Sequence, residues 1–420
     1  MTVNPFNEKP INLEKTIVDW KKINRKPYDK MTVDPYTKCR IILMNGTEFE
    51  AVKHSHAFSR HQNNNDIRRD LALVRRSEQQ QQKAIASLKP LDESILEHTI
   101  SYEQLAVDLT AELAKKERDK QVKAALDFAL LEDFDHLYRY ANLLEMDKGI
   151  IAERLVGNYT EIMPARPTVA HHRHPFDEVK RHVGKNADLG TKLATNIITA
   201  AEQQTMNYYM NIANFYPTDL GRRLYTEIGM VEEAHVTQYG SLLDPDCTWF
   251  EGNLMHEYTE CYLYYSMWKQ ESDENVKALW EQFYLMEVAH LHAAVKLLNK
   301  YDKKDWQEVI PDGTFPEILE LKSNKDYVRK ILKNTVCNTS NREDYAKIDV
   351  LPDDFTFFSY QNKVNKNLKD CASHVVIEKK IMKDGKDYRF EESANPQKAL
   401  RERTSDNVEL GRKKRVLLKK

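Results

Sequence analysis

Apolar residues recur at helical spacing through the central part of the chain. In the segment 219–243, for example, Leu224, Ile228, Val231 and Tyr239 fall on one stripe. With the turn signals between such segments, this pattern predicts a polar helix that ends at a proline, followed by three helical hairpins. The polar helix covers 65–89, and the hairpins cover 94–117 with 120–146, 187–215 with 219–243, and 252–270 with 274–300.

The flanking segments follow no such period. Near the N-terminus the short apolar stretch CRIILMNGTEFEAV contains Asn45-Gly46, which predicts a small β-hairpin. Near the C-terminus the strand-like pieces FTFFSY and SHVVIEKKIM precede a basic end, GRKKRVLLKK. The expected organisation is an N-terminal extension over 1–64, a helical domain over 65–310 and a partly extended C-terminal arm over 311–420.

Composition supports an all-α fold. Only 12 glycines and 14 prolines occur among 420 residues, and long helices tolerate neither residue well. The net charge of −2 gives no general attraction to nucleic acid or to an anionic membrane. No apolar run reaches the length of a membrane span. The five cysteines form no C-x-x-C motif, which excludes a paired-cysteine metal site and favours a reducing cytoplasm.

The hairpins share one chemical pattern, in which a glutamate is followed thirty residues later by a carboxylate-x-x-His. The members are Glu103 with Asp133 and His136, Glu202 with Glu232 and His235, and Glu257 with Glu287 and His290. A turn lies near the middle of each set, so fifteen residues run up one helix and fifteen run down the next. Residues i and i+3 share a helix face. Each hairpin therefore offers two carboxylates and an imidazole at one height.

This arrangement predicts a metal site. A buried carboxylate must be paired, protonated or bound to a metal, and oxygen and imidazole ligands without thiolate favour iron or manganese. Two alternatives stay open in the ligand set. Glu132, four residues before His136, competes with Asp133. His171, His172 and His174, in a Pro- and His-rich segment, are either accessory ligands or surface groups.

The connections between hairpins bear on how they pair. The first and second hairpins are separated by 147–186, which is long enough to cross the length of a bundle and is typical of a four-helix bundle with one long crossover. The second and third are joined by the short link 244–251, and they form the competing pair. The third hairpin is then an additional element.

The segments YEQLAVDLTAELAKK…ALLEDFDHLYRYANLLEMD, AAEQQTMNYYMNIAN…LYTEIGMVEEAHVTQYGSLLDP and MHEYTECYLYYSMW…YLMEVAHLHAAVKLL resemble the ferritin-like and rubrerythrin-like superfamily over about 92–300. The resemblance implies a ferritin-like four-helix bundle that holds two irons, or alternatively two manganeses, per site. It implies that the carboxylates and histidines of the three sets are the ligands. Asp133 departs from the glutamate that is usual in this motif.

The activities that the resemblance implies are reduction of peroxide or dioxygen and oxidation of ferrous iron. Because the paired C-x-x-C of a rubredoxin domain is absent, electrons are expected from a separate donor protein or from ferrous iron itself. The expected protein is an oxidoreductase that forms a homo-oligomer. Two other functions stay open, namely a structural or assembly-forming protein with a vestigial metal site and a manganese catalase-like enzyme.

Overall fold

A computed structural model describes residues 3–163, 165–172 and 174–385. The chain divides into two units, each built from three separate stretches of sequence. Unit 1 comprises Met1–Glu93, His182–Gln204 and Leu243–Leu321, and unit 2 comprises Ser94–Arg181, Thr205–Leu242 and Lys322–Lys420. The prediction of an all-α fold is confirmed, since helices dominate the described part of the chain and its only sheet has two short strands.

The helices of unit 1 are α1 (Trp20–Ile23), α2 (Pro35–Arg60), α3 (Asn65–Ala86), α9 (Trp249–Gln270) and α10 (Glu274–Leu297). Unit 2 contains α4 (Ile95–Lys116), α5 (Lys120–Lys148), α6 (Ala152–Leu155), α8 (Asp219–Gly240), α11 (Lys325–Thr335), α12 (Thr356–Val364), α13 (Ala372–Asp384) and the strands β1 (Asn338–Asn341) and β2 (Asp344–Lys347). Helix α7 (Leu189–Ile212) has its first part in unit 1 and its last part in unit 2. The six helices of the three expected hairpins and the polar helix therefore form where the apolar pattern predicts them.

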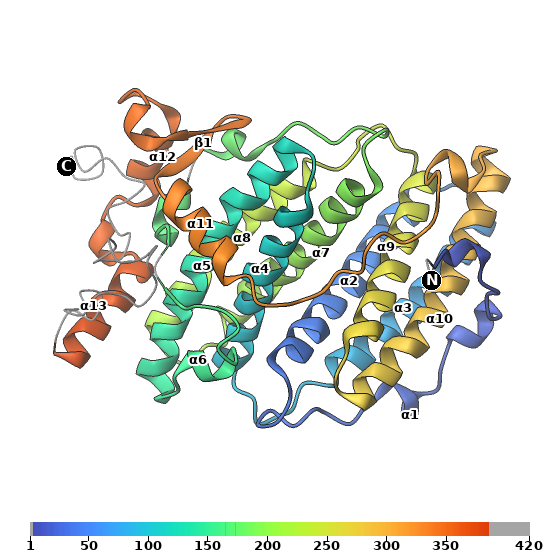
Figure 1. Cartoon of the computed structure of the whole chain (residues 1–420), viewed down its shortest axis with the longest axis horizontal. Coiled ribbons are helices and arrows are strands. Elements are labelled where there is room, and N and C mark those ends of the chain that lie inside the picture. Colours follow the sequence, from blue (N-terminus) through green and yellow to red (C-terminus); the bar gives the residue numbers. More distant parts are fainter. Residues whose placement is uncertain (1–2, 164, 173, 386–420) are drawn as a thin grey trace. The chain divides into compact units, whose positions relative to one another are not determined.

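Two hairpins make the interior of unit 1. Helices α2 and α3 form one and α9 and α10 form the other, with α2 beside α9 and α3 beside α10 (Figure 1). Helix α2 begins at a strong start signal: Asp34 accepts a hydrogen bond from the Tyr36 N–H at 2.8 Å, and Pro35 occupies the first helical position. Helix α9 begins at a capping box formed by Thr248 and Glu251.

The β-hairpin expected at Asn45-Gly46 is wrong, because both residues lie inside α2. Gly46 is explained by close helix packing instead of by a turn. A Cβ atom at this position would lie 2.8 Å from Gln204 Cβ and 3.3 Å from the Ala200 carbonyl oxygen, both on the part of α7 that belongs to unit 1. The missing side chain lets two helix backbones approach each other.

We therefore expect Gly46→Ala to destabilise unit 1 by about 1–3 kcal/mol, the usual cost of overpacking a core. Helix propensity alone would predict a gain of about 1 kcal/mol. The sign of the measured change in the free energy of unfolding therefore decides between the two effects. Urea unfolding followed by tryptophan fluorescence measures unit 1 selectively, because all five tryptophans lie in it. Gly252→Ala on α9 is the matched control, since its Cβ would make only ordinary contacts, at 3.6 Å or more.

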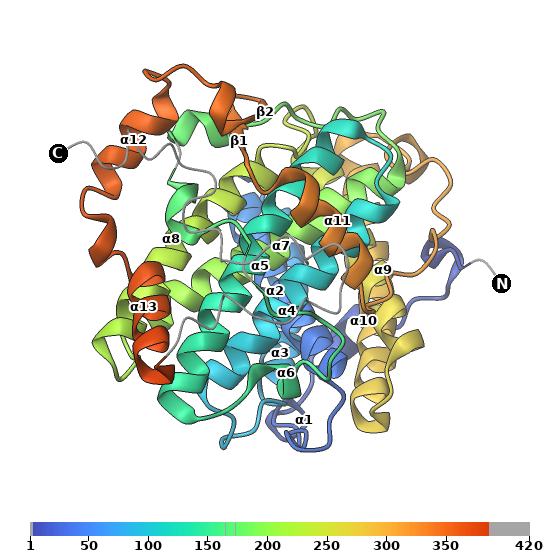
Figure 2. The same ribbon diagram turned by 60° about the vertical axis from the view of Figure 1, so that its left-hand side comes forward.

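In unit 2, helices α4 and α5 form a hairpin, and α8 packs beside α5. Helix α4 begins at a capping box between Ser94 and Glu97. The C-terminal segment packs onto this core: α11 contacts α4 and α5, and α13 contacts α5 and α8 (Figure 2). Glu227 of α8 fastens the start of α13 by accepting a hydrogen bond from the Ala372 N–H at 2.7 Å.

The strand-like reading of FTFFSY and SHVVIEKKIM is therefore wrong, because these segments form α12 and α13. Their apolar residues are buried at helical spacing, as Ala372, Val376 and Ile377 of α13 show. The strands that do form are the polar segments β1 and β2, which pair antiparallel with Asn338 opposite Lys347. The basic end, GRKKRVLLKK, lies outside the described residues.

The units do not follow the expected boundaries at 64 and 310. The segment 1–64 belongs to unit 1 and contributes α2 to its interior, and the described residues after 321 belong to unit 2. The pairing of hairpins also differs in one respect. The third hairpin, α9–α10, packs against α2–α3, a partner that the sequence pattern did not suggest. Among the described residues, no helix combines the length and the apolar character needed to cross a membrane.

Candidate metal-binding clusters

Six titratable side chains gather inside unit 1, and none is more than 2% exposed. They are Glu48 from α2, Glu78 from α3, Glu257 and Glu260 from α9, and Glu287 and His290 from α10. We call them the unit 1 cluster. Ligand atoms of Glu78, Glu257 and His290 lie within 4.8 Å of one another, and so do those of Glu257, Glu260 and Glu287. Glu257 thus belongs to two overlapping groups.

The unit 1 cluster has few internal partners. The Gln81 amide donates a hydrogen bond to Glu287 at 2.5 Å, His290 Nδ1 lies 3.0 Å from Glu287, and the Tyr264 hydroxyl donates to Glu48. In the described part of the chain, no lysine or arginine forms an ion pair with any of the six. Several buried atoms have no hydrogen-bond partner, namely one oxygen each of Glu48, Glu78 and Glu257, both oxygens of Glu260, and His290 Nε2.

Burial and mutual repulsion shift the protonation of this cluster. Burial, reinforced by neighbouring carboxylates, raises the pKa of Glu48, Glu257 and Glu260 well above their ordinary value. Burial raises the pKa of Glu78 to about 7, although the positive charge of His290 opposes the shift. Burial alone would lower the pKa of His290, but the adjacent Glu287 carboxylate outweighs it and raises that pKa.

Without a cation, the five carboxylates can lie together only if most of them are protonated. A metal ion of charge two or more would let them ionise, and it would give partners to the unpaired oxygens and to His290 Nε2. The donor set of carboxylate oxygens and one imidazole suits iron or manganese. The residues present therefore fit a metal centre of this kind.

A second group of carboxylates and histidines lies in unit 2. Ligand atoms of Glu103, His136 and Glu232 are within 4.8 Å of one another, as are those of Asp133, Glu232 and His235. We call these residues the unit 2 cluster. Each is fully buried or nearly so. Three helices of unit 2, α4, α5 and α8, supply all five residues.

Glu232 links the two histidines of the unit 2 cluster. One carboxylate oxygen lies 2.8 Å from His136 Nδ1 and the other lies 3.2 Å from His235 Nδ1. Burial alone would raise the pKa of Glu232, but the two imidazoles hold it well below its ordinary value. Glu232 thus pairs with both imidazoles, and it belongs to both groups of this cluster that could hold a metal ion.

Further polar groups surround this cluster. Glu132 contacts both His235 and His171, and the Tyr209 hydroxyl donates a hydrogen bond to Glu103. Thr110 donates to Asp133 at 3.4 Å. Both residues of the open alternative, Glu132 and Asp133, therefore face the cluster, and His171 is a buried partner of Glu132 instead of a surface group. In contrast to unit 1, imidazole nitrogens lie beside several of the carboxylates here.

The structure brings together most of the sequence-predicted ligands in two places. Glu257, Glu287 and His290 lie in the unit 1 cluster, and Glu103, Asp133, His136, Glu232 and His235 lie in the unit 2 cluster. Glu202 is 1% exposed on α7, in the part of this helix that belongs to unit 1 next to the boundary between the units. Its assignment as a ligand stays a prediction.

Sequence reasoning missed Glu48, Glu78 and Glu260. The first two follow the same thirty-residue offset as the other sets, and Gln81 stands three residues after Glu78, where the others have histidine. A search that accepted glutamine in place of histidine would have found this fourth set. Glu260 has no such signal, because it is one turn beyond Glu257 on the same helix face.

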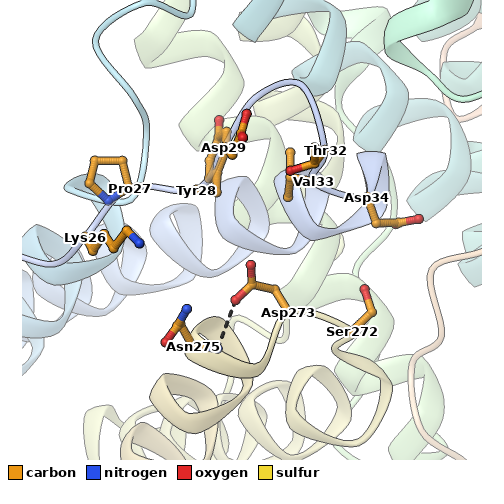
Figure 3. Close-up of a pocket in the computed structure, with 10 residues that line it drawn as sticks. All are labelled: Lys26, Pro27, Tyr28, Asp29, Thr32, Val33, Asp34, Ser272, Asp273 and Asn275. Carbon is orange, nitrogen blue, oxygen red and sulfur yellow. Dashed lines mark hydrogen bonds between the residues drawn. The ribbon is translucent and has the colours of Figure 1, made fainter.

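A surface pocket of about 460 Å³ lies elsewhere in unit 1, where the residues before α2 meet the turn between α9 and α10 (Figure 3). Its three aspartates accept local backbone hydrogen bonds: Asp29 from the Met31 N–H at 2.9 Å, Asp34 from the Tyr36 N–H at 2.8 Å, and Asp273 from the Asn275 N–H at 2.9 Å. The lining contains no histidine, cysteine or glutamate. The two buried clusters are therefore better candidates for chemistry than this pocket.

Comparison of the chain with models of known protein families, with curated proteins and with solved structures gave no match.

Proposed function

We propose that the chain is a ferritin-like protein in which each unit holds a dinuclear iron or manganese centre, and that it acts as an oxidoreductase on dioxygen or peroxide, or on ferrous iron. The observation that carries the proposal is the unit 1 cluster: five buried carboxylates on four helices, with unpaired oxygens and without an ion-paired lysine or arginine among the described residues. This much buried negative charge calls for a bound cation.

The residues have distinct parts in this proposal. In unit 1, Glu48, Glu78, Glu257, Glu260, Glu287 and His290 would hold the metals. Gln81 offers no imidazole and instead orients Glu287 through its amide, so one half of the unit 1 site has a nitrogen ligand and the other half has none. In unit 2, Glu103, Asp133, His136, Glu232 and His235 would hold them, with Glu232 between the two histidines.

When bound, iron or manganese would supply redox equivalents and a Lewis-acidic position for dioxygen or peroxide. The protein would fix the ligands and exclude water, since every member of both clusters is buried. The raised pKa of Glu78 means that this carboxyl can hold a proton near neutral pH in the metal-free protein. Electrons would come from a separate donor protein or from ferrous iron.

The proposal is tested by anaerobic reconstitution with Fe²⁺ or Mn²⁺, followed by metal analysis. We expect about four metal ions per chain, two per site, and consumption of peroxide or dioxygen by the loaded protein. Glu257→Gln is expected to reduce the content to about two, because this residue belongs to both groups of the unit 1 cluster. Oxygen evolution from peroxide without a reductant would distinguish a catalase-like reaction from a peroxidase-like one.

One observation favours a second function for unit 2 alone. Its histidines already pair with carboxylates, so the unit 2 cluster is also consistent with a structural hydrogen-bond network. About two metal ions per chain, all lost in Glu257→Gln, would support this role for unit 2. No metal uptake in either unit would contradict the proposed function and would favour the structural alternative for the whole chain.

A further inference from the structure

Two histidines lie next to the unit 1 cluster without belonging to it. The rings of His54 on α2 and His256 on α9 are stacked, with centroids 5.2 Å apart and planes 11° apart. His256 Nε2 lies 3.8 Å from an oxygen of Glu260, which is a member of the cluster. A series of three possible metal ligands, His54, His256 and Glu260, therefore ends at the cluster.

This series begins near solvent and continues inward. Both histidines are only partly buried, and 12% of the His256 side chain is exposed, whereas Glu260 is completely buried. The Nε2 atoms of both rings are enclosed.

The Nε2 atoms of His54 and His256 have no hydrogen-bond partner in the described part of the chain, and neither does Glu260 at either oxygen. Burial lowers the pKa of His54 to about 4, so its imidazole is neutral under ordinary conditions, and the neutral ring is the form that binds metal. If the His54 ring served only for packing beside Phe58 and Trp249, an apolar ring would avoid the cost of an unpaired buried nitrogen.

We propose that His54, His256 and Glu260 form an uptake route that passes a divalent transition-metal ion from solvent to the unit 1 cluster. The inference rests on the proposed function of that cluster. The ion is first held by imidazole nitrogen, then exchanges onto the unpaired carboxylate of Glu260, and then joins Glu257 and Glu287. Only ligands are exchanged in these steps, and no electron is transferred. Imidazole suits ions such as Fe²⁺, Co²⁺ and Zn²⁺.

The experiment follows Co²⁺ uptake by the full-length, metal-free chain in a stopped-flow instrument. Binding is observed as quenching of tryptophan fluorescence, which reports on unit 1 because all five tryptophans lie there. The variants His54→Phe and His256→Phe keep an aromatic ring at each position. The control is His61→Phe, since His61 is exposed and its ring stacks on Trp249 at 4.8 Å, outside the proposed route.

We expect His256→Phe and His54→Phe to take up Co²⁺ about tenfold more slowly than the parent, in line with the effects of removing groups next to metal ligands. The final metal content of unit 1 should equal that of the parent, and His61→Phe should behave as the parent. Thermal unfolding of each variant shows whether the fold is retained, and the two histidine variants serve as independent tests of the same route.

Parent-like uptake rates in both His54→Phe and His256→Phe would overturn the route and leave the proposed function intact. A loss of final metal content in His256→Phe as large as that in Glu257→Gln would also overturn it, because His256 would then be a ligand of the cluster itself. Absence of Co²⁺ uptake by the parent would overturn the proposed function of unit 1 and the route together.

Discussion

The metal-free chain is expected to lose stability in unit 1 as the pH rises from 5 to 8. The pKa of Glu78 is raised from 4.5 to about 7 by burial. Below pH 4.5 the carboxyl is protonated in both the folded and the unfolded chain, so it does not affect stability. Above pH 4.5 the unfolded chain ionises while the folded chain keeps the proton. The free energy of unfolding therefore falls progressively until about pH 7, where the total decrease reaches about 3 kcal/mol.

The neighbouring groups act in the same direction. The pKa values of Glu48, Glu257 and Glu260 are also raised, by burial and then by other carboxylates, and each adds to the loss at higher pH. Bound metal should reverse the trend, because it replaces the protons, and an ion at 100 times its Kd adds about 2.7 kcal/mol. Tryptophan fluorescence during urea unfolding at several pH values measures the effect in unit 1.

Two comparisons make this prediction specific. Glu78→Gln, which cannot ionise, should flatten the pH dependence of the metal-free protein by about 3 kcal/mol. Glu232 in unit 2 should have the opposite dependence, because its pKa is lowered: its contribution is present above about pH 4.5 and is lost only as the pH falls. A free energy of unfolding in unit 1 that stays constant or increases between pH 5 and 8 would contradict the raised pKa values of the carboxyl groups in the unit 1 cluster.

The regular part of the fold follows from local sequence signals. Apolar stripes and the turns between them place α4, α5 and α7 to α10 within a few residues of the predicted bounds. In the structure, Ser94 and Asp119 cap the starts of α4 and α5. The thirty-residue offset also predicts which carboxylates face each other across a hairpin, since it depends only on helix rise and the position of the turn. These are properties of neighbouring residues, and they require no knowledge of the distant partner.

The pairing of distant segments depends on packing that no local signal reports. Helices α2 and α9 are about two hundred residues apart in sequence, yet they lie side by side in unit 1. The Asn45-Gly46 pair imitates a turn, although Gly46 serves close helix contact. Local signals also miss part of the site. Glu260 joins Glu287, and Gln81 reaches Glu287, only because the fold brings α3, α9 and α10 together.

Replacement of Glu232 by glutamine is expected to destabilise unit 2 strongly. Its two oxygens lie 2.8 Å from His136 Nδ1 and 3.2 Å from His235 Nδ1. A glutamine amide carries no charge and keeps only one acceptor oxygen, so the imidazoles lose their shared partner. Removing one member of a buried charged set typically costs about 3–5 kcal/mol.

The same change should halve the metal content of the reconstituted protein from about four to about two ions per chain, because Glu232 belongs to both groups of the unit 2 cluster. Urea unfolding followed by far-ultraviolet circular dichroism, together with metal analysis, measures both effects. Glu233→Gln is the matched control: this half-buried neighbour only accepts a hydrogen bond from Thr237 at 3.0 Å, and it should change stability by less than about 0.5 kcal/mol. A parent-like metal content in Glu232→Gln combined with the loss of stability would mean that this carboxylate holds the two histidines in place without binding metal.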